Sequence, residues 1–196
     1  MVLSERSGQQ EDDEGGQEQY AFYYRTSRFT FEESWLYNDS ELDEFQREPF
    51  IASFNLLSKN GTNIENITLI TVHTKPAQAV NETASLHNVV ETYKTNSTES
   101  DIILLGDFNA DCGYASTYDL NQLDIRSPEY LWVVPDSADT TYSENTHCAY
   151  DRIVLTSNID GRFFGKWGVD RDMSSSEISD HYPVWFDLDI REDVPE

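Results

Sequence analysis

The stretch Ile102-Ile-Leu-Leu-Gly-Asp-Phe-Asn-Ala-Asp-Cys112 decides the fold, because four apolar residues run directly into a glycine and then into polar side chains. Such a run predicts a buried strand over Ile102 to Leu105 that ends at Gly106. Ligands usually bind where strands end, and Asp107 and Asn109, two residues apart on an extended chain, would point the same way. Their oxygens suit a metal-held phosphate; the alternative is an ordinary Asx turn.

Other strands and one helix surround this stretch. Strands are expected at Tyr20 to Tyr24, Phe50 to Leu56, Ile67 to Thr74, Leu131 to Val134, Ala149 to Leu155 and the alternating Val184, Phe186, Leu188 and Ile190. A helix is expected from Pro76, with Ala79, Leu86, Val89, Val90 and Tyr93 on one side. This order predicts an α/β (α+β) fold, a two-layer mixed β-sandwich flanked by helices, rather than a doubly wound parallel sheet.

Length and composition predict a single domain over residues 1–196, with 38% hydrophobic content to form its core. Residues 9–18 are acidic and Gly-rich, which is typical of a loop, and residues 191–196 are a charged tail. No stretch approaches the roughly 18 apolar residues of a membrane helix, and no apolar signal core follows Met1. We therefore expect no membrane partner and no secretion signal in this sequence.

The net charge of −24, from 37 acidic and 13 basic residues, argues against broad electrostatic attraction to a polyanion. An acidic surface suits a cation-binding protein or a solvated secreted one. Any contact with DNA must therefore be local and assisted by metal ions.

The cysteine count and the glycosylation motifs favour a secretory route. Five Asn-x-Ser/Thr motifs begin at Asn38, Asn60, Asn66, Asn81 and Asn96, more than chance suggests. In a secreted protein Cys112 and Cys148 would form a disulfide, whereas in a cytosolic one they would be two buried thiols.

Two histidines and an aspartate have positions that suit acid–base chemistry. In the sequence Ser-Asp-His-Tyr-Pro before the last strand, His181 can act as a general base and Asp180 as a metal ligand. His73, at the end of an apolar strand, could protonate a leaving oxygen, and Asp151 could orient a histidine. The alternatives are a solvated Asp-His pair, a structural histidine and a salt bridge from Asp151 to Arg152.

These motifs together resemble a known superfamily. Gly106-Asp-Phe-Asn109 with Ser179-Asp-His-Tyr-Pro183 is similar to the paired signature of the endonuclease/exonuclease/phosphatase superfamily. Pro135 to Thr141 and Cys148 to Ile153 resemble the deoxyribonuclease I family in particular, and the likeness covers about Glu18 to Ile190. A sphingomyelinase or an inositol phosphatase is the alternative within the superfamily, but the last two segments favour DNA.

The resemblance implies endonucleolytic hydrolysis of double-stranded DNA that leaves 5′ phosphates. His181, oriented by Asp151, would activate water, and His73, paired with Glu18, would protonate the leaving 3′ oxygen.

The resemblance also implies how substrate and metals are held. Asp107, Asn109 and Asp180 would position the scissile phosphate and Mg²⁺, while Arg47 would grip the DNA backbone. Two Ca²⁺ sites are implied, one at Asp139 and Thr141 and the other at Asp39, Asp43, Phe45 and Glu48; the alternative is plain acidic turns. Cys112 and Cys148 match the longer disulfide of the family.

In the family that this sequence resembles, a strand, a helix and a second strand precede the part that matches here. That second strand ends in a metal-binding glutamate. Nothing upstream of Ser4-Glu5 matches that portion, so we expect an incomplete domain. Two readings follow. The sequence is part of a secreted, active nuclease, or it is a shortened and catalytically inactive homologue that acts as a binding protein, with actin as the candidate partner.

Overall fold

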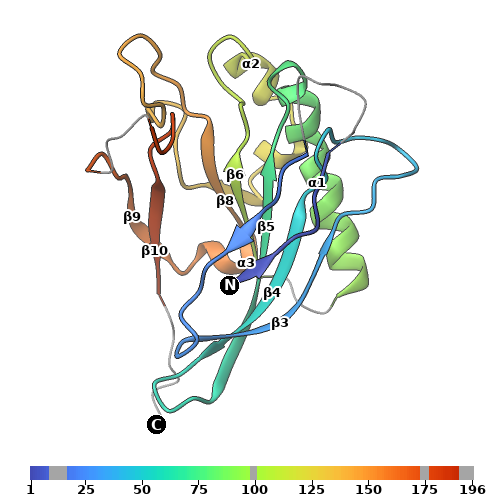
Figure 1. Ribbon diagram of the computed structural model, residues 1–196, viewed down its shortest axis with the longest axis vertical. Coiled ribbons are helices and arrows are strands. Elements are labelled where there is room, and N and C mark those ends of the chain that lie inside the picture. Colours follow the sequence, from blue (N-terminus) through green and yellow to red (C-terminus); the bar gives the residue numbers. More distant parts are fainter. Residues whose placement is uncertain (9–16, 98–100, 173–176, 190–196) are drawn as a thin grey trace.

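The computed structural model describes residues 1–8, 17–97, 101–172 and 177–189, and its centre is a six-stranded mixed sheet (Figure 1). In spatial order its strands are β3 (Phe29–Leu36), β4 (Phe50–Leu57), β5 (Asn63–His73), β6 (Ile102–Asp107), β8 (Asp151–Thr156) and β7 (Tyr130–Trp132). Strands β5 and β6 are parallel, and the other neighbours are antiparallel. Residues 9–16 of the predicted loop and the predicted tail at 191–196 lie outside the described residues.

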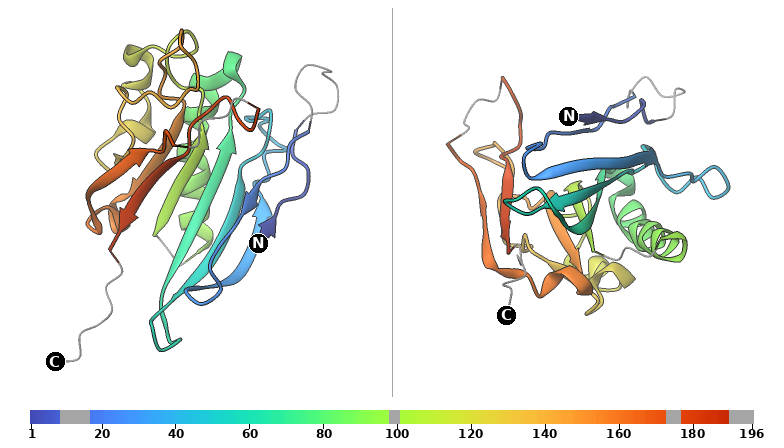
Figure 2. Two further views of the ribbon diagram at one scale, coloured as in Figure 1. Left: turned by 60° about the vertical axis from the view of Figure 1, so that its left-hand side comes forward. Right: turned by 90° about the horizontal axis from the view of Figure 1, so that it is seen from below.

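Helix α1 (Ala79–Asn96) covers one face of this sheet (Figure 2). It continues from the short 3-10 helix η1 (Pro76–Gln78), as a proline in the first turn favours. The predicted apolar side is confirmed, since Ala79, Leu86, Val89, Val90 and Tyr93 are all buried. The shorter helices are α2 (Thr117–Leu120), η2 (Asp124–Arg126) and α3 (Ser157–Asp160).

The opposite face of the sheet packs against a two-stranded antiparallel sheet of β9 (Phe163–Val169) and β10 (Val184–Leu188), as Figure 2 shows. Trp167 and Phe186 pack there against the buried cluster that includes Ile103. A third pair, β1 (Val2–Leu3) and β2 (Ala21–Phe22), contacts β4 where Phe22 stacks on Phe50. The mixed α/β architecture is therefore confirmed, and a full two-layer sandwich stays a prediction.

The strands differ from expectation in several places, and β7 and β8 begin and end within two residues of the expected bounds. The sequence patterns missed β3 and β9, and the strand expected over Tyr20 to Tyr24 is reduced to Ala21–Phe22. Within the described ranges, no helix combines the length and apolar character that crossing a membrane requires.

Gly106 explains how β6 ends. Its φ of +138° is disfavoured for residues with a side chain, and a Cβ atom there would lie 2.0 Å from the carbonyl oxygen of Val72. Only glycine lets β5 and β6 stay this close at their carboxyl ends. The close approach brings His73 and Asp107 side by side in the register of the two strands.

Candidate active site

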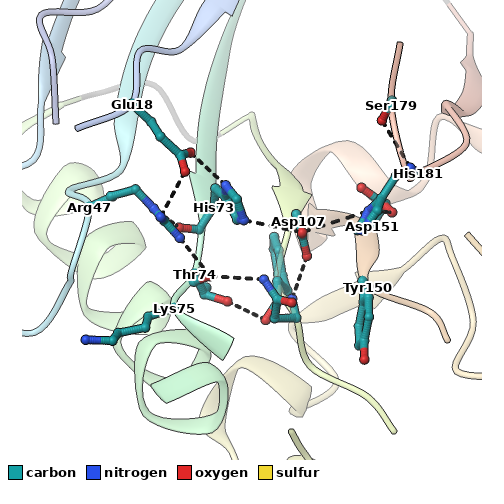
Figure 3. A network of polar contacts seen from close by, with 12 residues as sticks. Glu18, Arg47, His73, Thr74, Lys75, Asp107, Tyr150, Asp151, Ser179 and His181 are labelled. Atoms are coloured by element: carbon teal, nitrogen blue, oxygen red, sulfur yellow. Dashed lines mark hydrogen bonds and ion pairs between the residues drawn. The ribbon is translucent and has the colours of Figure 1, made fainter. Parts of the chain in front are cut away.

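Three neighbouring strands deliver polar side chains to one edge of the central sheet. His73 ends β5, Asp107 ends β6, and Asp151 begins β8; the register pairs Asp107 with both of the others. Figure 3 shows His73 and His181 on either side of Asp107. Nε2 of His73 lies 3.5 Å from Oδ2 of Asp107, and Nδ1 of His181 lies 3.8 Å from the same oxygen. The predicted residues thus meet around one carboxylate.

His181 is held by Asp151, with 2.7 Å between its Nδ1 and the carboxylate Oδ2. The hydrogen bond and charge of Asp151 outweigh burial and raise the pKa of His181 from 6.5 to about 9. The ring also stacks on Tyr150, with 5.9 Å between the ring centroids. Asp151 therefore orients the histidine and increases its basicity.

His73 has a carboxylate partner of its own. Its Nδ1 lies 2.7 Å from Oε2 of Glu18, and its backbone N–H donates to the hydroxyl of Tyr20 at 3.2 Å. Burial raises the pKa of Tyr20 to about 12, so that hydroxyl stays neutral. The pairing that the resemblance implied for Glu18 and His73 is present in this geometry.

Asp107 and Asn109 are positioned by the turn that follows β6. The backbone N–H of Asn109 donates to Oδ1 of Asp107 at 2.8 Å, which is the Asx turn considered as the alternative. Asn109 has a φ of 47°, and its side-chain amide donates to the carbonyl of Thr74 at 3.0 Å. The turn and the site are compatible, because the turn fixes both side chains at the strand end.

Arg47 lies under this site rather than on its surface. Only 5% of the residue is exposed, and its guanidinium donates to the carbonyls of His73 and Thr74 and to Oε1 of Glu18. Arg47 therefore supports both members of the Glu18–His73 pair. Its contact with DNA stays a prediction.

The carboxylate of Asp107 lies close to that of Asp151 at this sheet edge. Burial, followed by the charge of Asp151, raises the pKa of Asp107, so negative charge is crowded at this point. Carboxylate oxygens are the ligands that Mg²⁺ prefers, and the exposed Asp180 is next to His181. Within the described residues, no group of three or more His, Cys, Asp or Glu side chains is arranged to hold a metal ion. Asp107 and Asp180 as magnesium ligands thus stay predictions.

The two predicted calcium loops differ. Burial and the charges of Glu48 and Asp43 raise the pKa of Asp39, whose Oδ2 accepts the N–H of Phe45. Within the described residues these carboxylates do not form a group that could hold a metal ion, so the calcium site at this loop stays a prediction.

The carboxylate of Asp139 already has partners. Burial is outweighed by hydrogen bonds from His147, Arg171 and Thr141, which lower the pKa of Asp139. A calcium ion at Asp139 and Thr141 would have to displace the guanidinium of Arg171 from this carboxylate, and that calcium site stays a prediction.

The expected disulfide is present between Cys112 and Cys148, with a Cα–Cα distance of 5.8 Å. It joins the loop after Asn109 to the segment that leads into Asp151. Beside it, the carboxylate of Asp111 accepts the N–H of Ala149 at 2.7 Å. The disulfide and this hydrogen bond hold β6 and β8 together at the sheet edge where the polar side chains meet.

The support given by Thr74 was missed from sequence, and Arg152, considered as a salt-bridge partner of Asp151, pairs with Asp136 instead. Thr74 follows His73 and supplies the carbonyl for Asn109 and Arg47. Arg152 is fully buried next to Asp151, where it donates to the carbonyls of Val134 and Ala110. The only indication in the sequence was that Thr74 follows His73 and that Arg152 follows Asp151.

Comparison with known proteins places this geometry in a family. Residues 6–181 match the model of the "Endonuclease/Exonuclease/phosphatase family". The chain therefore belongs to that family, and it is similar in sequence to its deoxyribonuclease-1 members.

Deoxyribonuclease-1-like 1 of Chlorocebus aethiops is 36% identical over 182 residues, which are 88% of this chain and 59% of that protein. Deoxyribonuclease-1 of Ovis aries is 35% identical over 183 residues, 85% of this chain and 68% of that protein. A 3′ phosphatase from Neisseria, solved with a product DNA hairpin, shares the fold at a TM-score of 0.59 and 14% identity, covering 82% of this chain and 72% of its own. The chain thus spans about 59% of the length of the first of these relatives.

Proposed function

We propose that the protein hydrolyses phosphodiester bonds of double-stranded DNA endonucleolytically, with divalent cations, and leaves 5′ phosphates. The observation that carries this proposal is the pair of carboxylate-bound histidines, His181 with Asp151 and His73 with Glu18, which approach Asp107 from opposite sides. One base and one acid on opposite sides of a phosphate suit in-line displacement. Similarity to deoxyribonuclease-1 proteins supports DNA as the substrate.

His181 would act as the general base. Asp151 holds Nδ1, which leaves Nε2 to take a proton from the attacking water. Because its pKa is raised to about 9, His181 must first lose its own proton, so hydrolysis should increase as the pH rises toward 9. The role of Asp151 is to fix the ring and stabilise the imidazolium that forms.

His73 would act as the general acid. Glu18 occupies Nδ1, and Nε2 faces Asp107, on the side where the phosphate would lie. A proton on Nε2 could pass to the leaving 3′ oxygen as the P–O bond breaks. Arg47 keeps Glu18 in place and offsets its charge.

Asp107 and Asp180 would hold Mg²⁺, and Asn109 would donate to a phosphoryl oxygen. The bound cation would supply charge stabilisation at the phosphoryl oxygens. Ca²⁺ would bind at the loop of Asp39, Asp43 and Glu48. Because the chain carries a net charge of −24, these cations would also reduce its repulsion from the DNA backbone.

The disulfide and the five glycosylation motifs support secretion. We also propose the two-layer sandwich as the architecture of this domain, supported by the apolar side chains of Phe163, Trp167 and Phe186 that pack against the central sheet. The alternative is an inactive homologue that binds a partner such as actin.

Nicking of supercoiled plasmid distinguishes the two functions. The chain is assayed with MgCl₂ and CaCl₂, beside His181→Ala, His73→Ala and the surface control Lys166→Ala. We expect nicking by the parent and the control, loss in both histidine variants, and complete loss when EDTA removes the metals. If the folded chain does not nick DNA but binds actin in co-sedimentation, the binding function replaces the nuclease function.

A further inference from the structure

The loop from Asp139 to His147 is part of the support of the catalytic pair. The N–H of Tyr142 donates to the carbonyl of Asp180 at 2.7 Å, and the N–H of Tyr182 donates to the carbonyl of Thr140 at 2.8 Å. An isolated β-bridge pairs Thr141 with His181. The loop is thus hydrogen-bonded to the segment that carries His181.

The same loop also holds the partner of His181. The hydroxyl oxygen of Thr140 accepts the N–H groups of Tyr150 and Asp151, both at 3.1 Å, and that hydroxyl donates to the carbonyl of Cys148. Thr140 is completely buried. A shift of this loop would therefore move His181 and Asp151 relative to each other.

Arg171 connects the two sides of this arrangement. It comes from the chain just after β9, and its Nη2 donates to the backbone carbonyl of Asp139 at 2.9 Å and to Oδ2 of the same residue at 3.2 Å. Its guanidinium carbon lies 4.8 Å from the centroid of the Tyr182 ring. Arg171 thus contacts the loop through Asp139 and the catalytic segment through Tyr182.

Both carboxylate oxygens of Asp139 already have partners. Oδ1 accepts both the N–H and the hydroxyl of Thr141, while Oδ2 lies 3.1 Å from Nδ1 of His147 as well as near Arg171. Calcium needs six to eight oxygen ligands and is repelled by cationic side chains. Here the guanidinium of Arg171 is the cation that lies beside the carboxylate of Asp139.

We propose that Arg171 is a positioning residue that locks the Asp139–His147 loop against the His181 segment, so that this loop needs no calcium ion. The proposal rests on the proposed function for its catalytic consequence, although its structural part can be tested without activity. In this arrangement the guanidinium of Arg171 contacts Asp139 where the resemblance implied a calcium ion.

Amide hydrogen exchange, measured by NMR on the full chain, tests the proposal. The reporters are the N–H groups of Tyr142 and Tyr182, because these two bonds join the loop to the catalytic segment. Four proteins are measured: the parent, Arg171→Ala, Arg171→Lys and the control Lys166→Ala. Each is measured once in EGTA and once in CaCl₂. The control removes one cation from a more exposed ion pair, 3.9 Å from Asp187.

In the parent we expect both amides to exchange at the same rate with and without calcium. In Arg171→Ala exchange should accelerate by about tenfold at both amides, Arg171→Lys should recover part of that loss, and calcium should restore nothing. The control should match the parent. Strong slowing of parent exchange by CaCl₂, or unchanged exchange in Arg171→Ala, would overturn the proposal.

A kinetic measurement adds the catalytic consequence. If the parent nicks DNA, Arg171→Ala should lower kcat while KM changes little, since a displaced His181–Asp151 pair affects the chemical step. A variant in which KM rises while kcat stays unchanged would contradict a positioning role for Arg171. If the parent does not nick DNA, the exchange experiment still decides the structural role, so failure of the two proposals can be told apart.

Discussion

Nδ1 of His181 lies 2.7 Å from Oδ2 of Asp151, and both residues are tied to the same loop through Thr141 and Thr140. This hydrogen bond fixes which ring nitrogen can face a water molecule. Asp151→Asn would keep the shape of the side chain but lose the charge that stabilises the imidazolium.

We therefore expect Asp151→Asn to lower the rate of plasmid nicking by about a hundredfold or more while the protein stays folded. Initial rates are measured at saturating DNA, and circular dichroism checks the fold. Asp187→Asn is the matched control, because this exposed aspartate pairs only weakly with Lys166 at 3.9 Å and lies away from the site. Equal rates for the two variants would remove Asp151 from the mechanism.

Stability should fall as the pH rises from about 6.5 to about 9. The folded pKa of His181, about 9, is above its unfolded value of 6.5, so its contribution to stability is complete below pH 6.5 and is lost as the pH rises through 9. The loss should be about 2 to 3 kcal/mol in the free energy of unfolding.

Urea unfolding at several pH values measures this change, in EDTA so that metal binding does not contribute. His181→Asn lacks the titrating group and should show a flatter profile over the same interval. A parallel decline in the parent and the variant would assign the pH dependence to other residues.

The central strand and the places of its polar side chains could be predicted because their signals are local. The apolar run Ile102 to Leu105 forms β6, and the polar side chains after it lie at the strand end as expected. His73 and His181 were recognised because they too flank apolar strands. That Asp151 could orient a histidine was inferred from its position before a strand, but its pairing with His181 and that of Glu18 with His73 came from family resemblance, since these contacts join residues 30 and 55 positions apart.

The missed strands show where local patterns fail. In β3 the alternation is interrupted by Glu32 and Glu33, and the pairing with β4 shifts register between Phe31 and Glu33. In β9 the pattern is interrupted by glycines, and Gly168 is needed because the Trp185 ring of β10 lies where a Cβ atom would be. Both strands depend on a partner that is distant in sequence or on an irregular register.

The burial of three arginines could not be predicted from the sequence either. Arg47, Arg152 and Arg162 are each 5% exposed or less, although arginine is usually a surface residue. Each is accommodated by carbonyls or carboxylates from other segments, such as the carbonyls of His73 and Thr74 around Arg47. The resemblance had assigned Arg47 to the DNA backbone, and Arg152 had been considered only as a salt-bridge partner of Asp151.

Removing the disulfide should destabilise the protein by about 3 to 4 kcal/mol, because Cys112 and Cys148 close a loop with a sequence separation of 36. The double variant Cys112→Ala/Cys148→Ala is compared with the oxidised parent by urea unfolding. Reduction of the parent with dithiothreitol should reproduce the loss, and the double variant should not respond to reductant. An unchanged midpoint on reduction would show that the cross-link does not constrain the chain.

Gly106→Ala tests the close approach of β5 and β6 on which the site depends. The added methyl group would meet the carbonyl oxygen of Val72 at 2.0 Å, and alanine disfavours a φ of +138°. The two strands must separate or the turn must change, at a cost of about 3 kcal/mol or more.

The same movement would carry Asp107 away from His73, so Gly106→Ala should lose activity under conditions where it is still folded. Gly161→Ala is the control, because nothing lies within 4 Å of its added methyl group and its φ is −63°. Thermal unfolding and plasmid nicking are measured for both variants. The pairing of His73 with Asp107 at the ends of β5 and β6 leaves no space for the methyl group. If Gly106→Ala were as stable and active as Gly161→Ala, that pairing would therefore not be the arrangement that supports catalysis.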